Sequence, residues 1–213
     1  MTAMAIDQDY PEIREQVARI CQRFPGSYWR ALDAENAYPT AFVEALTESG
    51  YLAALIPEEY GGAGLPLRAA AVILETIQGC GASAAACHAQ MYTMGTLLRH
   101  GSPEQKARYL PEIAAGRLRL QAFGVTEPGR GSDTPMLKTR AERRDDRWIV
   151  NGQKIWTSRA LHSDLMLLLV RTTPVERCHK RSDGLSVLLV DLRLAKGQGL
   201  DIRPIDAMIN HNT

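Results

Sequence analysis

The sequence predicts an α+β protein, with an N-terminal all-helical bundle over residues 1–117 followed by an antiparallel β-barrel or sandwich over residues 118–213. Two observations predict this class. Apolar residues recur at helical spacing up to about Arg117, and short apolar or alternating segments of strand length follow it. A run of helices followed by a run of strands is typical of an α+β protein or of two separate domains.

Composition excludes several classes of protein. The 213 residues are 45% hydrophobic and 23% charged, and their net charge of +1 favours neither nucleic acid nor an anionic membrane surface as a partner. No segment approaches the about 18–20 apolar residues that a membrane span needs. The N-terminal nine residues lack the basic and apolar regions of a signal peptide. The four cysteines show no metal-binding or disulfide spacing, so we expect a cytoplasmic protein with reduced thiols.

The helical half contains start and stop signals at several points. Ser102-Pro103-Glu104-Gln105 combines an N-cap serine, proline at the first helical position and a glutamine that completes a capping box. We expect this helix to break before Pro111, with a last turn that ends at Gly116. The Gly-rich end of Tyr51–Leu65 predicts a tight, irregular turn after a buried apolar stretch. A helix over residues 9–23 is expected to stop near Pro25-Gly26. The other expected helices cover residues 39–50, 66–77 and 83–98.

The residue pattern of the second half predicts strands. Residues 137–143 alternate between apolar or small and charged side chains, which indicates a half-buried strand. Asp145-Asp146 predicts a turn, and Asn151-Gly152 predicts a two-residue hairpin turn from which 153–157 returns as a strand. Leu200, Ile202 and Ile205 suggest a last strand. The remaining expected strands cover residues 120–125, 148–150, 165–171 and 185–192, with a solvated loop at 172–183.

The candidate binding site is the loop Thr126–Asp133 together with a later tryptophan, Trp156. A turn rich in glycine and hydroxyl groups suits an anionic or carbonyl-rich ligand, and an indole suits a flat ring. Together they predict a cofactor with a planar head and a phosphate tail. The alternative is an ordinary surface turn with Trp156 in the core. Glu127, beside Pro128, is expected to be a structural hydrogen-bond partner rather than a general base.

Several other sites are excluded by missing patterns. Gly129–Thr134 almost fits the dinucleotide fingerprint, but Thr134 replaces the third glycine and no helix is expected to follow. The five histidines form no HxxH or HExxH pattern, so a metal site is not expected. The GxSxG elbow of α/β-hydrolases is also missing.

Four segments together resemble the acyl-CoA dehydrogenase family, which consists of flavoproteins that introduce an α,β double bond into acyl thioesters. The segments follow the family's order and spacing over nearly the whole chain. They are Ile56–Leu65, His100–Lys106 with Tyr109-Leu110-Pro111, Val125–Asp133 and Asn151–Ser158.

The resemblance implies an N-terminal helical domain and a middle β-domain that binds FAD and substrate, with the family's C-terminal helical domain absent. We expect the middle domain to be incomplete, because the chain ends abruptly after Met208. Ser132 would also contact the substrate, Trp156 would pack on the flavin ring, and Ser158 would lie near the hydride-accepting nitrogen. The implied FAD-binding residues are Phe123, Val125, Thr126, Ser132, Trp156, Thr157 and Ser158.

The implied function is α,β-desaturation of an acyl-CoA thioester in fatty acid metabolism, with hydride passed to FAD and the α-proton passed to a glutamate base. That glutamate belongs to the C-terminal domain of the family, so no catalytic residue is assigned in this chain. The chain alone is expected to be a fragment that holds FAD weakly and has negligible turnover. The implied partners are acyl-CoA and an electron-transfer flavoprotein, and full-length members form homo-oligomers. The alternatives are an acyl-CoA oxidase or flavin monooxygenase of the same fold, or a non-catalytic binding module.

Overall fold

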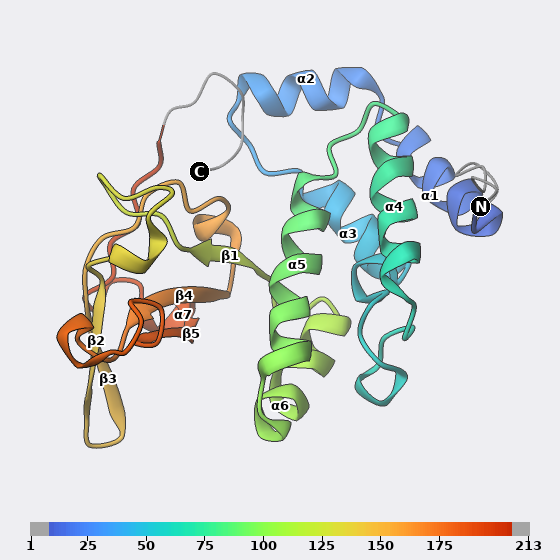
Figure 1. The fold of residues 1–213 in the computed structure, drawn as a ribbon. Coiled ribbons are helices and arrows are strands. Elements are labelled where there is room, and N and C mark those ends of the chain that lie inside the picture. The colour runs from blue at the N-terminus through green and yellow to red at the C-terminus, as the bar shows by residue number, and fades with distance from the viewer. Residues whose placement is uncertain (1–8, 206–213) are drawn as a thin grey trace, which may run out of the picture. The chain divides into compact units, whose positions relative to one another are not determined.

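The computed structural model describes residues 9–205, and these form two compact units that divide between Leu120 and Gln121. The first unit is helical and the second contains a five-stranded sheet (Figure 1). The expected abrupt end after Met208 lies outside the described residues, as do residues 1–8.

The helical unit packs its helices around one apolar core. In this unit α4 packs against both α1 and α5, and α5 in turn packs against α6 (Figure 1). Phe42, Leu46, Ile73 and Ile77 are completely buried at its centre. The helices are α1 (Pro11–Gln22), α2 (Gly26–Ala34), α3 (Thr40–Glu48), α4 (Leu67–Gly79), α5 (Ala85–His100) and α6 (Pro103–Ala114), with 3-10 turns η2 (Tyr51–Ala53) and η3 (Glu58–Tyr60).

The capping box at the start of α6 is confirmed. The Gln105 N–H donates to the Ser102 hydroxyl (3.2 Å), and the Gln105 side chain accepts from the Ser102 N–H (2.9 Å). The predicted break at Pro111 is wrong, because α6 continues through the proline to Ala114. Leu110 and Ile113 are buried on either side of Pro111, and their packing keeps the helix intact despite one missing N–H. The sequence prediction also missed α2, which begins at the expected stop.

The sheet unit contains one long antiparallel pair. Strand β4 (Leu165–Arg171) pairs with β5 (Leu185–Asp191) from Leu165↔Asp191 to Arg171↔Leu185. Strands β2 and β3 form an antiparallel hairpin, whose turn is at Asp145 (φ 56°) and Asp146. The other strands and short helices are β1 (Leu120–Gly124), β2 (Arg140–Arg144), β3 (Arg147–Asn151), η4 (Thr134–Met136), η5 (Ala160–His162), η6 (Val175–Arg177) and α7 (Leu192–Ala195).

The strand order is β1-β4-β2-β3, with β5 also on β4. The α+β class is confirmed, but the sheet is mixed rather than an antiparallel barrel, because β2 meets β4 in parallel at Arg140↔Arg171. No strand forms around Leu200 and Ile202, where Leu200 makes only an isolated bridge to Lys196. Those two side chains pack on the core formed by Ala122, Ala141, Ala160, Met166, Leu168, Val170 and Leu192.

The predicted hairpin turn at Asn151-Gly152 is wrong as well. Residues 152–158 form no strand, and the hairpin of this region is the one that turns at Asp145-Asp146. Gly152 is needed for close packing instead, because a Cβ at this position would lie 2.6 Å from the Thr139 Cα. The chain from Gly152 onward is therefore held against the segment that leads into β2.

Candidate functional site

The loop that follows β1 begins with a tight turn. The Arg130 N–H donates to the Glu127 carbonyl (2.9 Å), and the Glu127 N–H donates to the Arg130 carbonyl (3.2 Å). Pro128 presets the first central position of this turn, and Gly129 has a positive φ of 75°, the backbone of a type II turn. The sequence Glu127–Arg130 therefore fixes a rigid, exposed turn tip at the centre of the candidate site.

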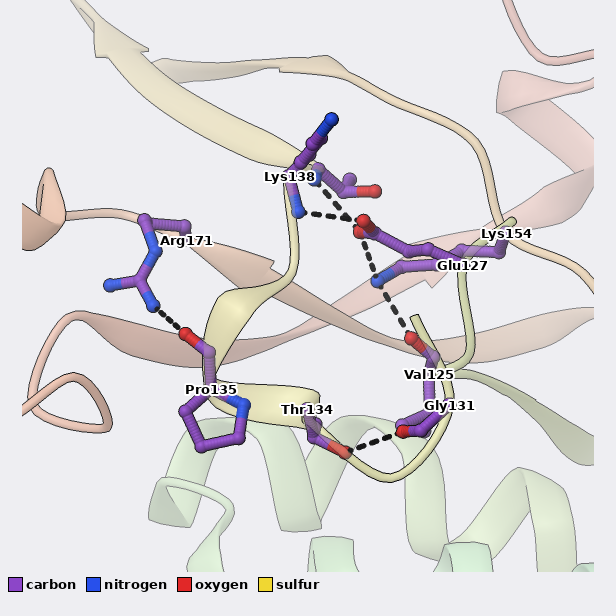
Figure 2. A network of polar contacts seen from close by, with 9 residues as sticks. Val125, Glu127, Gly131, Thr134, Pro135, Lys138, Lys154 and Arg171 are labelled. Carbon is purple, nitrogen blue, oxygen red and sulfur yellow. Dashed lines mark hydrogen bonds and ion pairs between the residues drawn. The ribbon is translucent and has the colours of Figure 1, made fainter. Parts of the chain in front are cut away.

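Below this turn the Glu127 side chain organises a buried polar network (Figure 2). Its carboxylate accepts hydrogen bonds from the backbone N–H groups of Lys138 (2.6 Å) and Thr139 (2.8 Å). It also accepts one from the Lys154 ammonium (3.0 Å), which in turn donates to the Val125 carbonyl (2.9 Å). One carboxylate thus joins three segments that lie far apart in the sequence.

The environment of the network fixes its charges. Burial by itself raises the pKa of the Glu127 carboxyl, but hydrogen bonds from Thr139, Lys138 and Lys154 outweigh burial and lower the pKa to about 2. Burial lowers the pKa of the Lys154 ammonium, and the Glu127 carboxylate opposes that change. The structure therefore confirms that Glu127 is a structural hydrogen-bond partner, since a carboxylate with so low a pKa is a poor base.

The segment around Trp156 lies directly beside the loop after β1. The Ile155 N–H donates to the Thr126 carbonyl (2.9 Å), and the Ser158 N–H donates to the Trp156 carbonyl (3.1 Å). Together with the Lys154 contact to Val125, these bonds bring Val125 and Thr126 next to the residues that carry the indole. Two parts of the predicted site are thus adjacent in one unit.

Trp156 itself is not a core residue. Its side chain is 58% exposed, and its backbone has a positive φ of 61°, which is uncommon for a bulky residue. The alternative interpretation of the sequence, in which Trp156 lies in the core, is therefore wrong. An exposed indole on a backbone held by hydrogen bonds is suited to stack on a flat ring.

The other predicted site residues lie on the same unit. Phe123 is in β1 and is half-buried, as are Thr157 and Ser158 after Trp156. Ser132 is exposed and follows the tight turn, on a short loop in which the Thr134 hydroxyl donates to the Gly131 carbonyl (3.4 Å, Figure 2). Of the hydroxyl-bearing residues that the sequence singles out, Ser132 is exposed and Thr126, Thr157 and Ser158 are half-buried.

Two basic residues that organise the site were missed by the sequence analysis. Lys154 neutralises Glu127, and Arg171 at the end of β4 donates to the Pro135 carbonyl (2.5 Å) and the Arg181 carbonyl (2.9 Å). Lys154 is the only charged residue between Trp148 and Ser158, and this was its signal in the sequence. Its partner Glu127, however, lies 27 positions away. The pairing could be recognised only in the folded chain.

Two further properties concern the whole described range. Between residues 9 and 205, no three His, Cys, Asp or Glu side chains are grouped so that they could hold a metal ion. None of the helices in this range combines the length and apolar character that crossing a bilayer requires.

Known proteins match both halves of the chain. The family model "Acyl-CoA dehydrogenase, N-terminal domain" matches residues 7–117, and "Acyl-CoA dehydrogenase, middle domain" matches residues 122–212. Acyl-CoA dehydrogenase FadE26 of Mycobacterium tuberculosis is 32% identical over 207 residues, which cover 95% of this chain and 47% of that protein. The chain therefore spans about half the length of such curated relatives.

Solved structures agree with the sequence matches. The acyl-CoA dehydrogenase from Geobacillus kaustophilus superposes with a TM-score of 0.80 at 26% identity, over 89% of this chain and 49% of that one. The prolyl acyl carrier protein oxidase AnaB superposes with a TM-score of 0.83 at 25% identity, over 96% of this chain and 53% of that one. This chain belongs to the acyl-CoA dehydrogenase family.

Proposed function

We propose that these 213 residues form the helical (1–117) and middle (118–213) domains of an FAD-dependent oxidoreductase that desaturates an acyl-CoA thioester. The observation that carries the proposal is the match of two successive acyl-CoA dehydrogenase domains, in order, over nearly the whole chain. The remainder of the enzyme, which is present in relatives about twice as long, would complete the site.

The residues present fit a flavin in two respects. Trp156 offers an exposed, conformationally fixed indole, which can cover one part of a planar ring. Thr126 lies beside it, and its carbonyl accepts a hydrogen bond from the Ile155 N–H, so the backbone of Thr126 has a defined position. Bound FAD would supply the hydride-accepting chemistry.

We assign roles to the chain's own residues on this basis. Phe123, Val125 and Thr126 would position the ring together with Trp156, Thr157 and Ser158. Ser132, on the exposed loop after the turn, would contact the phosphate groups and the thioester arm of the substrate. The Glu127–Lys154 pair would hold these segments in register without taking part in proton transfer.

The base that removes the α-proton would lie outside these residues. Glu127 is the carboxylate nearest to the proposed ring site in the sequence, and its pKa of about 2 makes it unsuited to that role. The other expected participants are an acyl-CoA substrate and an electron-transfer flavoprotein that reoxidises the cofactor.

The proposal is tested by adding FAD to the purified chain and then adding acyl-CoA without oxygen. We expect weak FAD binding and negligible acyl-CoA-dependent reduction of a dye by the chain alone. The same assay on a protein that also contains the remaining part of the fold should show bleaching of the flavin absorption. Rapid dye reduction by the 213 residues alone would contradict the assignment of the base.

An acyl oxidase is the second candidate, and it is favoured by the likeness to AnaB over 96% of this chain. An oxidase would release hydrogen peroxide when acyl substrate is added in air, whereas a dehydrogenase would need an electron acceptor. A folded chain that shows no FAD binding in a titration would instead favour a non-catalytic binding module.

A further inference from the structure

Two cysteines meet where α1 and α4 end. Cys21 lies in the last turn of α1 and is buried, with 4% of its surface exposed. Cys80 is the C-cap residue of α4 and is exposed. The two helices pack against each other (Figure 1), and the two thiols are close enough to form a side-chain hydrogen bond.

Ion pairs show how the two helices are aligned. Asp9 pairs with Arg68 near the start of both helices, and Arg14 pairs with Glu75 (2.6 Å) farther along. The partners advance in the same direction, so α1 and α4 run parallel. The contact between Cys21 and Cys80 is the next one in this series, and it lies at the C-terminal end of both helices.

The thiols interact directly. Burial, together with the charge of the adjacent Cys80 and a side-chain hydrogen bond with it, raises the pKa of the Cys21 thiol to about 12. Cys21 is therefore a thiol at neutral pH, and it loses its proton only as its sulfur reacts. Cys80, which is exposed, is the sulfur that a reagent in solution reaches first.

The backbone around Cys80 can adjust. Cys80 lies between Gly79 and Gly81, and no other atom lies within 4 Å of the position that a Cβ would take at either glycine. Gly81 also has a positive φ of 75° and ends the helix. A small shift of this Gly-Cys-Gly segment can therefore bring the sulfurs to the distance of about 2.05 Å that a disulfide requires.

We propose that Cys80 and Cys21 form a thiol modification site, at which a low-molecular-weight disulfide such as glutathione disulfide produces a Cys21–Cys80 disulfide. The Cys80 thiol gives its proton to solvent and its sulfur attacks one glutathione sulfur, so that the S–S bond of the glutathione disulfide breaks. One glutathione leaves as a thiolate and takes up a proton from solvent. Cys21 then gives its proton to solvent, its sulfur displaces the second glutathione from Cys80, and the bridge forms. Two protein thiols are oxidised by two electrons, and one glutathione disulfide is reduced to two thiols.

The bridge would fasten α1 to α4 across 59 positions of the sequence. Such a bond restricts the unfolded chain, so the oxidised protein gains thermal stability. Both cysteines belong to the helical unit, whereas the residues proposed to bind the flavin belong to the sheet unit.

The test is incubation of the folded chain with glutathione disulfide, followed by mass analysis of the intact protein and of its peptides. In the wild-type protein we expect a Cys21–Cys80 bond and a rise in Tm of about 4 °C or more, reversed by a thiol reductant. In Cys21→Ala, glutathione should remain on Cys80 at a level about tenfold above that in the wild type. Cys21→Ser serves as a second variant if the alanine variant does not fold.

The matched controls are Cys80→Ser, which should lose both the bridge and the rise in Tm, and Cys178→Ser in the sheet unit, which should keep both. The proposal is overturned if the wild-type protein keeps glutathione on Cys80 as long as Cys21→Ala does. It is also overturned if Cys80 stays unmodified, or if the bridge joins a different pair of cysteines.

Discussion

The Lys154 ammonium lies 3.0 Å from the Glu127 carboxylate, and the two side chains are only 9% and 5% exposed. A buried ion pair offsets its desolvation only when the remaining hydrogen-bonding positions are also filled. Here the backbone N–H groups of Lys138 and Thr139 and the Val125 carbonyl fill them. The pair therefore specifies how three segments of the proposed site meet.

Removal of the carboxylate should destabilise the sheet unit. Glu127→Ala leaves a buried ammonium without its counter-charge and the N–H groups of Lys138 and Thr139 without their acceptor, and we expect a loss of about 3–5 kcal/mol in the free energy of unfolding. Urea unfolding in a Trp29→Phe background would report on this unit, because Trp148 and Trp156 both lie in it. Glu142→Ala, an exposed change on β2, should cost less than about 0.5 kcal/mol. Equal effects of the two substitutions would contradict the structural role of Glu127.

The same carboxylate predicts how stability depends on pH. The pKa of Glu127 is about 2 in the folded protein, below its ordinary value of 4.5, so its contribution is present above pH 4.5 and is lost as the pH falls toward 2. The difference corresponds to about 3 kcal/mol. Unfolding measured at several pH values should show this loss in the wild type and a much smaller one in Glu127→Gln. Parallel pH profiles for the two proteins would rule out this origin.

Substitution by alanine should have opposite effects on stability at two glycines of the helical unit. A Cβ on Gly62 would lie 2.0 Å from the Ile56 carbonyl oxygen, so Gly62→Ala forces the turn after η3 apart and should cost about 1–3 kcal/mol. Gly79 at the end of α4 has open space around it, and Gly79→Ala should be neutral or stabilise by up to about 1 kcal/mol. Thermal unfolding followed by circular dichroism compares them. A neutral Gly62→Ala would disprove the close approach.

Strand β3 should promote self-association. It is an edge strand of the described sheet, and Trp148, Ile149 and Val150 are 43%, 39% and 37% exposed. Exposed apolar edge strands pair with other chains, and a charge on such a strand opposes this. Sedimentation velocity at increasing concentration should show association that Ile149→Lys reduces and that Glu142→Lys on β2 does not. Association unchanged by Ile149→Lys would place the contact elsewhere.

The sequence predicted the elements whose signals are local. Ser102 with Gln105 marked the start of α6, and the apolar run 165–171 marked β4 with the bounds that the structure has. Two of the failures involve long-range contacts. Gly152 was read as a turn residue, but it is required by packing against Thr139, and Pro111 is tolerated because its neighbours are buried.

The candidate site also combines features with local signals and features that depend on long-range contacts. Gly129 and Pro128 predicted the rigid turn, since turn chemistry is encoded by adjacent residues. The pairing of Lys154 with Glu127 joins residues 27 positions apart, and the exposure of Trp156 depends on what the fold leaves uncovered. The spacing of apolar residues in the sequence predicts neither the pairing of Lys154 with Glu127 nor the exposure of Trp156.

The central claim is that the loop after β1 and the segment around Trp156 form part of an FAD site. The most direct measurement is the dissociation constant for FAD, from quenching of flavin fluorescence, in the wild type, Trp156→Ala and Trp148→Ala. Because aromatic stacking contributes about 1 kcal/mol or more, Trp156→Ala should weaken binding about fivefold or more, and Trp148→Ala should leave it unchanged. Equal affinities in all three proteins, or a loss only in Trp148→Ala, would contradict the account.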